Sequence, residues 1–168
     1  RCPHCASPFT PHEKGHECAG CRAPLRVEDG IICPGESSRN DDESLSGDLA
    51  PLLEYVKDSG WESGREKFLS GIENDQNFIR FGYSLREIQA SWKFLLDFKN
   101  HRRVLIIDNG LGAVSSSIGK EYDDVYILDY NKLKLECIKK RMDEGGVTGI
   151  SYVLAQKARR LPFPAGFF

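Results

Sequence analysis

Apolar side chains recur at helical spacing through the middle of the chain. Three helices are predicted from this period: one that begins after Asp48 as its N-cap, one over residues 61–70, and one over residues 84–98. The third has the clearest pattern, because Ser84 and Glu87 form a capping box at its start. The apolar positions expected to face a core are Leu49, Leu52, Leu53, Val56, Phe68, Leu69, Leu85, Ile88, Trp92 and Leu95.

The period changes near residue 103. The continuous β-branched run at residues 104–107 is typical of a parallel strand that is buried on both faces. Two further strands are predicted at residues 125–128 and 150–154. Between the strands, one helix is predicted over residues 113–120, and another from a cap at Asn131 to a pair of glycines. This alternation predicts an α/β, doubly wound domain with right-handed crossovers.

Two Cys-x-x-Cys motifs open the chain, with 12 residues between them. Four thiolates in a tetrahedral array suit Zn²⁺, so the motifs predict a zinc ribbon whose ligands are Cys2, Cys5, Cys18 and Cys21. A disulfide pair and a redox centre are the alternatives. The first is disfavoured because no signal-like apolar stretch is present, and the second because three prolines interrupt the region. Cys33 lies in an apolar stretch and is expected to be a packed thiol.

Composition is typical of a soluble, cytoplasmic protein. The chain has 168 residues, of which 40% are hydrophobic and 29% charged, and no apolar run approaches the ~20 residues needed to cross a membrane. The net charge of −2 argues against nonspecific nucleic-acid binding. Basic residues of the predicted 131–144 helix are expected to form a solvated face; they are Lys132, Lys134, Lys139, Lys140 and Arg141. Three parts are predicted: a zinc ribbon (1–35), an acidic linker with a helical lead-in (36–100), and the α/β domain (101–168).

Candidate ligand-binding residues follow the first two predicted strands of that domain. Gly110 and Gly112 lack side chains where the backbone leaves the first strand, so a cofactor can approach the main chain closely. Asp129 ends the second strand, where a carboxylate can accept hydrogen bonds from both hydroxyls of a ribose. Together these residues predict a nucleoside site. The alternative for Asp129 is a plain turn residue at the end of a strand.

These motifs resemble a known family. Residues 103–168 are similar to the first half of a class I S-adenosylmethionine-dependent methyltransferase of the type 11-like branch: residues 104–112 resemble motif I and residues 125–131 motif II. The segment Leu-Pro-Phe-Pro-Ala-Gly-Phe-Phe at residues 161–168 resembles the lead into the fourth strand. Residues 18–31 look like the zinc module that precedes many bacterial methyltransferases. A dehydrogenase-type Rossmann domain fits less well, because its third glycine would fall at Ser115.

The resemblance implies a Rossmann-like, three-layer sandwich that is incomplete here, preceded by a small zinc ribbon and belonging to a longer enzyme. Its cofactors would be S-adenosylmethionine and Zn²⁺. The cofactor-binding positions carried over by the motifs are Asp108, Gly110, Gly112, Asp129, Tyr130, Lys157 and Ala158. No catalytic residue can be named.

Three positions depart from the family pattern. Ile106 stands where motif I usually has an acidic residue, and Asp108 replaces its first glycine. Lys157 aligns with the aspartate that usually meets the adenine amino group. Lysine has donors only and cannot accept from that amine, so cofactor binding is expected to be weaker than usual.

Three functions remain open from the sequence. The first is methyl transfer to an unidentified acceptor, a small molecule being favoured over RNA. The second is a non-catalytic scaffold that binds a protein partner through the ribbon and helices. The third is an RNA-modifying methyltransferase whose basic side chains grip phosphates; these side chains are Lys99, Arg102, Arg103, Lys157, Arg159 and Arg160.

Overall fold

One seven-stranded mixed sheet forms the frame of the molecule. The computed structural model describes residues 7–12, 15–34, 43–95, 102–107, 110–155, 161, 163 and 166–168. The strand order in the sheet is β1-β2-β3-β4-β7-β6-β5. The strands are β1 (Phe9–His12), β2 (Gly15–Cys18), β3 (Pro24–Glu28), β4 (Ile31–Pro34), β5 (Arg103–Ile107), β6 (Asp124–Asp129) and β7 (Ile150–Leu154). The fold is therefore α/β, as predicted.

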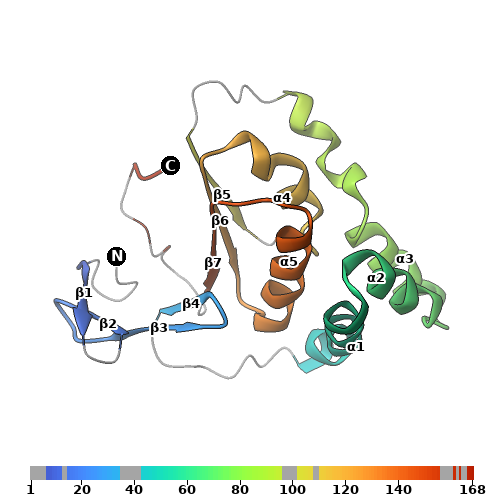
Figure 1. The fold of residues 1–168 in the computed structure, drawn as a ribbon, viewed down its shortest axis with the longest axis horizontal. Helices are drawn as coiled ribbons and strands as arrows, with labels where there is room; N and C mark the ends of the chain where they lie inside the picture. The colour runs from blue at the N-terminus through green and yellow to red at the C-terminus, as the bar shows by residue number, and fades with distance from the viewer. Residues whose placement is uncertain are drawn as a thin grey trace.

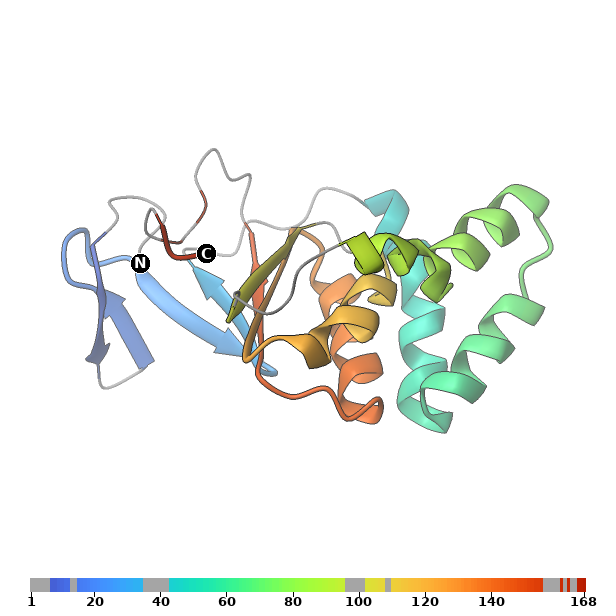
Figure 2. The same ribbon diagram turned by 90° about the horizontal axis from the view of Figure 1, so that it is seen from above.

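The cysteine-containing N-terminal region is joined to the α/β region by its last strand. Strands β1 to β4 form an antiparallel meander, and β4 then pairs in parallel with β7, with Ile31 opposite Tyr152 and Ile32 opposite Val153. Figure 2 shows the meander continuing the sheet on the side away from the helices. The predicted three-part division stays a prediction, but one sheet runs through the first and third parts.

The three parallel strands lie where the sequence predicted them. β5 pairs with β6 and β6 with β7, all in parallel register. One detail of the prediction is wrong: β5 is not buried on both faces, since the side chain of Ile107 is 55% exposed. The reason is its position, because β5 is the last strand in the sheet order.

Helices cover one face of the parallel strands in the described part of the chain (Figures 1 and 2). They are α4 (Ala113–Ile118), followed by a 3₁₀ turn, η2 (Gly119–Glu121), and α5 (Lys132–Glu144). The side chains of Leu135, Ile138 and Met142 on α5 are fully buried against the sheet, as their spacing predicted. The opposite face carries a smaller cluster that Phe163 joins, its ring meeting Tyr126 edge to face.

A second helical layer packs outside α5. It contains α1 (Glu43–Ser59), α2 (Trp61–Ser70) and α3 (Asp75–Ser84), followed by a 3₁₀ helix, η1 (Glu87–Leu95). The α1 side chains predicted to face a core are buried, and they share a cluster with Cys137 of α5. Asp48 is not the N-cap, which corrects the prediction. The helix begins a turn earlier at Glu43, in a polar stretch where no apolar period marks its start.

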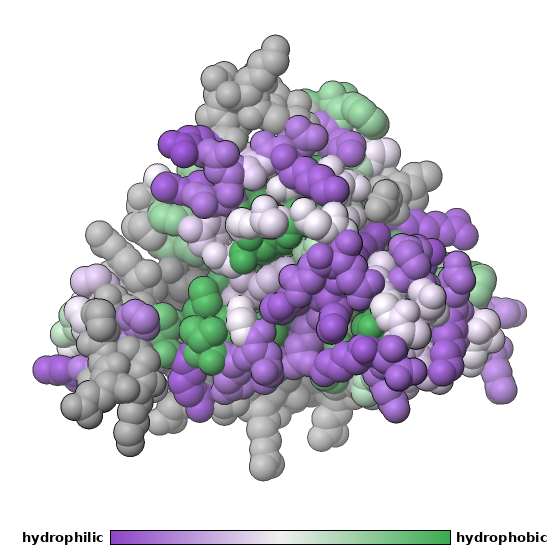
Figure 3. Space-filling model, viewed as in Figure 1, coloured by the Kyte–Doolittle hydropathy of each residue, from purple (hydrophilic) through white to green (hydrophobic). Residues whose placement is uncertain are grey.

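The predicted helix over residues 84–98 is also corrected. Ser84 is the last residue of α3, and its Oγ donates to the carbonyl of Arg80 instead of capping a new helix. Residues 87–95 form a 3₁₀ helix, whose three residues per turn no longer place the predicted apolar positions on one face. Trp92 and Leu95 are accordingly exposed, the latter by 87%. Figure 3 shows apolar residues on the surface near the C-terminal end of η1, at the top of the view.

Candidate functional site at the carboxyl edge of the parallel strands

The carboxyl ends of β5, β6 and β7 meet at one edge of the sheet, called here the carboxyl edge. Ile107 lies opposite Leu128, and Asp129 lies opposite Leu154. The backbone N–H of Ala155 donates to the carbonyl of Asp129 at 2.7 Å. Segments that leave parallel strands at such an edge are where open α/β sheets bind ligands.

A glycine turn connects β5 to α4 at this edge. Gly110 and Gly112 both have positive φ, 55° and 83°, a conformation that side-chain-bearing residues rarely adopt. A Cβ on Gly112 would lie 3.3 Å from side-chain atoms of Ile138 and Met142. The turn and the packing on α5 both require a glycine at position 112. Close approach of a ligand is therefore not the sole reason for this glycine.

Asp129 ends β6 with a buried carboxylate. The residue is 1% exposed, its Oδ1 accepts from the backbone N–H of Asn131 at 2.9 Å, and its Oδ2 lies 2.8 Å from the ammonium of Lys134. The alignment of Oδ2 is that of an ion pair and not of a well-directed hydrogen bond. The carboxylate is therefore at the predicted place but is engaged inside the protein.

The two residues after Asp129 have different roles. Tyr130 is half-exposed at the carboxyl edge. Asn131 is buried and caps α5, because its Oδ1 accepts from the backbone N–H of Lys134 at 3.1 Å. The predicted cap is confirmed. The cap also fixes where α5 starts, and so brings the Lys134 side chain to Asp129.

Two basic residues of α5 are not on a solvated face, contrary to the prediction. The Lys134 side chain is mostly buried beside Asp129. Arg141 is 5% exposed, donates to the carbonyl of Leu111 in the glycine turn at 2.9 Å, and lies over the ring of Trp61 on α2. Arg141 therefore ties the glycine turn to the outer helical layer. The sequence carried no signal for this, because a basic residue on an amphipathic helix is usually solvated.

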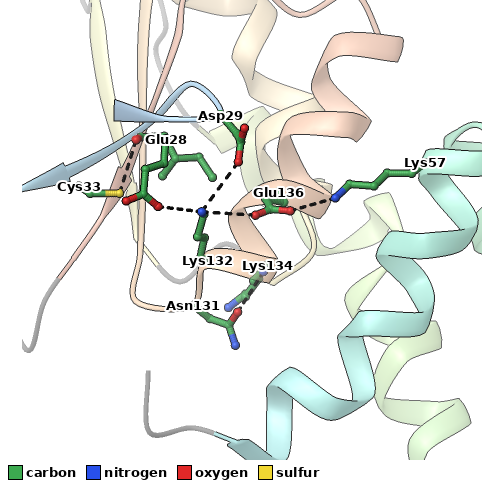
Figure 4. Close-up of polar contacts among 9 residues, drawn as sticks. Glu28, Asp29, Cys33, Lys57, Asn131, Lys132, Lys134 and Glu136 are labelled. Carbon is green, nitrogen blue, oxygen red and sulfur yellow. Dashed lines mark hydrogen bonds and ion pairs between the residues drawn. The ribbon is translucent and has the colours of Figure 1, made fainter. Parts of the chain in front are cut away.

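Lys132 joins the N-terminal meander to the start of α5 (Figure 4). Its ammonium lies 2.9 Å from the carboxylate of Glu28 at the end of β3 and 3.9 Å from that of Asp29 in the turn that follows. The same ammonium lies 4.0 Å from the carboxylate of Glu136, one helical turn along α5. Glu136 also meets Lys57 of α1 at 3.3 Å. The hydrogen bond and charge of Lys132 hold the pKa of Glu28 below its usual value. The network connects three regions of the chain, and sequence analysis missed it because its partners are far apart in the chain.

The second Cys-x-x-Cys motif forms a tight turn after β2. The backbone N–H of Cys21 donates to Sγ of Cys18 at 3.4 Å, and the N–H of Arg22, at a positive φ of 61°, donates to the carbonyl of Cys18. The turn therefore directs one backbone donor at the sulfur of Cys18. Within the described ranges no three His, Cys, Asp or Glu side chains are grouped as a metal site. Cys33 is buried, as expected.

Several predicted site residues lie outside the described part of the chain: Cys2, Cys5, Asp108, Lys157 and Ala158. Four members of the predicted basic surface also lie outside it. The other two are paired with carboxylates: Arg102 with Asp123 at 2.8 Å, and Arg103 with Asp124 at 3.2 Å. These pairs leave those guanidinium groups less available for phosphates.

No family model matches this chain, and no curated protein matches its sequence. Among the described helices, none has the length and apolar character that a membrane crossing requires. The site is therefore defined by its own geometry alone.

Proposed function

We propose that the carboxyl edge binds S-adenosylmethionine and that the protein is a Rossmann-like methyltransferase acting on an unidentified acceptor. One observation carries the proposal. A turn with two left-handed glycines follows β5, and a carboxylate ends the neighbouring parallel strand β6, so both reach the same edge of the sheet. This is the arrangement that nucleoside-containing cofactors use in α/β folds.

The residues of the carboxyl edge fit the nucleoside part of this cofactor once the Lys134 side chain moves away from the Asp129 carboxylate. A carboxylate has about four acceptor positions, and Asn131 and Lys134 occupy two at Asp129. The remaining positions suit ribose hydroxyls, but the carboxylate is sealed from solvent. Ligand entry therefore requires the Lys134 side chain to swing outward. The cofactor supplies an electrophilic methyl group, and the part of this chain is to hold the nucleoside.

The proposal is tested by titrating S-adenosylhomocysteine into three forms of the protein in a calorimeter. Asp129→Ala should bind about ten- to hundredfold more weakly than the wild type, because hydrogen bonds to a charged acceptor are worth ~1.5–3 kcal/mol. Lys134→Ala should bind at least as tightly as the wild type, because it removes the side chain that pairs with the carboxylate and leaves that acceptor position for a ribose hydroxyl. Thr10→Ala, on β1 and remote from the carboxyl edge in the strand order, is the matched control and should bind like the wild type.

A second candidate is a non-catalytic scaffold, and the sealed Asp129 carboxylate is the observation that favours it. In a scaffold the Asp129–Lys134 pair would be a structural link between β6 and α5. The same titration separates the two candidates. Absence of binding by both the wild type and Lys134→Ala would mean that the edge is closed for structural reasons, and the methyltransferase proposal would fail.

We further propose that the N-terminal meander holds a structural Zn²⁺, with Cys18 and Cys21 as two of its ligands. The turn around Cys18 supports this, since it directs a backbone donor at the sulfur. Metal analysis should find one equivalent of zinc in the wild type and none in Cys18→Ser. Cys33→Ser is the control: burial raises the pKa of the Cys33 thiol, so this residue is expected to stay protonated and uninvolved.

A further inference from the structure

One side chain of α5 holds the glycine turn between β5 and α4. The guanidinium of Arg141 donates to the carbonyl of Leu111 at 2.9 Å. Leu111 lies between Gly110 and Gly112, both of which have positive φ. Arg141 is 5% exposed and Leu111 is 3% exposed, so the hydrogen bond lies out of contact with bulk water. A charge-assisted hydrogen bond in such surroundings is a strong one.

This bond fixes the orientation of the peptide group between Leu111 and Gly112. Gly112 offers little resistance to a flip of that peptide, because glycine adopts positive and negative φ about equally. The peptide is trans and planar, so its C=O and its N–H point to opposite sides. Since the carbonyl is directed at Arg141, the N–H of Gly112 is directed away from α5. A flipped peptide would present a carbonyl there in place of the donor.

Trp61, the first residue of α2, restrains the guanidinium. Its ring lies over the guanidinium of Arg141, with 5.1 Å between the ring centroid and Cζ, and Trp61 is itself 4% exposed. The backbone N–H of Trp61 donates to the carboxylate of Glu144, three residues beyond Arg141 on α5. A cation on the face of an indole is held more strongly when both are buried. The indole ring therefore limits the directions in which Arg141 can donate.

We propose that Arg141 is a positioning residue of the cofactor site, which keeps the N–H of Gly112 directed at an acceptor atom of the bound nucleoside cofactor. This inference rests on the proposed function of the carboxyl edge. Arg141 acts through the backbone of the turn and does not touch the cofactor. A turn that is ordered before binding loses less conformational entropy when the ligand arrives, so Arg141 raises the affinity without a contact of its own.

Two measurements on the full chain test the proposal. Hydrogen–deuterium exchange of the ligand-free protein follows the opening of residues 110–116, where the N–H of Ser116 donates to the carbonyl of Gly112. Calorimetric titration with S-adenosylhomocysteine gives the affinity. Arg141→Met keeps an unbranched apolar side chain but cannot donate to Leu111. Residues 110–116 should exchange at least about tenfold faster in this variant, and the ligand should bind about ten- to hundredfold more weakly.

Two further variants separate positioning from general stability. Arg141→Lys keeps the charge and a donor but lacks the planar group that lies on Trp61. Its exchange rate and affinity should fall between those of the wild type and Arg141→Met, and it decides the question if Arg141→Met does not fold. Phe68→Leu is the matched control, because it opens a void in the apolar cluster that contains Trp61 and Leu111. It should lower the stability but leave the affinity and the exchange of residues 110–116 at wild-type values.

The possible failures are distinguishable. Exchange of residues 110–116 that stays at the wild-type rate in the Arg141 variants, or that Phe68→Leu accelerates equally, would overturn the control of the turn by Arg141. Faster exchange with undiminished affinity would overturn its role in cofactor binding. Absence of binding by the wild type would overturn the proposed function and that role with it, while faster exchange in Arg141→Met would still show that Arg141 holds the turn.

Discussion

Two glycines in neighbouring helices have opposite surroundings. Gly64 of α2 is buried, and a Cβ there would lie 2.6 Å from the backbone nitrogen of Val56 on α1. Gly82 of α3 has open space at the same point. The first glycine is present because two helices of this chain cross there. The second has no such reason within the described residues, and this difference separates the part of the helical layer that is packed from the part that is exposed.

The largest effect is expected at the packed crossing. Gly64→Ala should destabilise the protein by ~1–3 kcal/mol or more, because the close atoms belong to the backbone of α1 and cannot rotate away. The free energy of unfolding in urea measures this loss.

The matched control for Gly64→Ala is Gly71→Ala at the end of the same helix. A Cβ on Gly71 would make only ordinary contacts at 3.6 Å, so the stability should change by less than ~0.5 kcal/mol. Equal losses in the two variants would show that the crossing with α1 is not what requires a glycine at position 64.

A smaller effect of opposite sign is expected at the exposed position. Gly82→Ala should stabilise the protein by up to ~1 kcal/mol, because alanine is the better helix former and nothing opposes its methyl group. For a chain of this size that is a rise of about 2–4 °C in the melting temperature. A fall in the melting temperature would mean that another part of the molecule already occupies the space above Gly82.

The smallest effect is expected at the junction of the meander and α5, and it depends on pH. Lys132→Met removes the ion pair that lowers the pKa of Glu28. The pKa of Glu28 in the folded protein lies below its ordinary value of 4.5. The stabilisation from the ion pair is therefore complete above pH 4.5 and is lost as the pH falls through the folded-state pKa.

The difference in melting temperature between wild type and Lys132→Met should therefore persist from neutral pH down to about 4.5 and shrink below it. A difference that does not change with pH would indicate that the aliphatic stem of Lys132, and not its charge, holds the junction.

The sequence predicted helices and strands correctly where other parts of the chain cover their apolar side chains. β7 and α2 were placed at their observed bounds, and the apolar face of α5 is buried against the sheet. It failed in η1, where Trp92 and Leu95 have helical spacing but no covering element among the described residues, and it did not mark α3 as a helix. An apolar period shows which side chains can be buried together, and tertiary contacts decide whether they are.

The candidate site shows the same limit. Asp129 and the two glycines were found because their order along strand and turn is local. Lys134 and Arg141 were assigned to solvent, because their burial depends on where α5 lies relative to β6, the glycine turn and Trp61. A linear pattern does not contain that position.

Photolabelling tests the central claim most directly. Ultraviolet irradiation of the full chain with tritiated S-adenosylmethionine, followed by peptide mapping, locates the bound cofactor. The label should fall in the glycine turn around residues 110–112 or in residues 129–131, and excess S-adenosylhomocysteine should prevent it. Labelling that the competitor leaves unchanged, or labelling confined to segments away from the carboxyl edge, would contradict the assignment of that edge as the cofactor site.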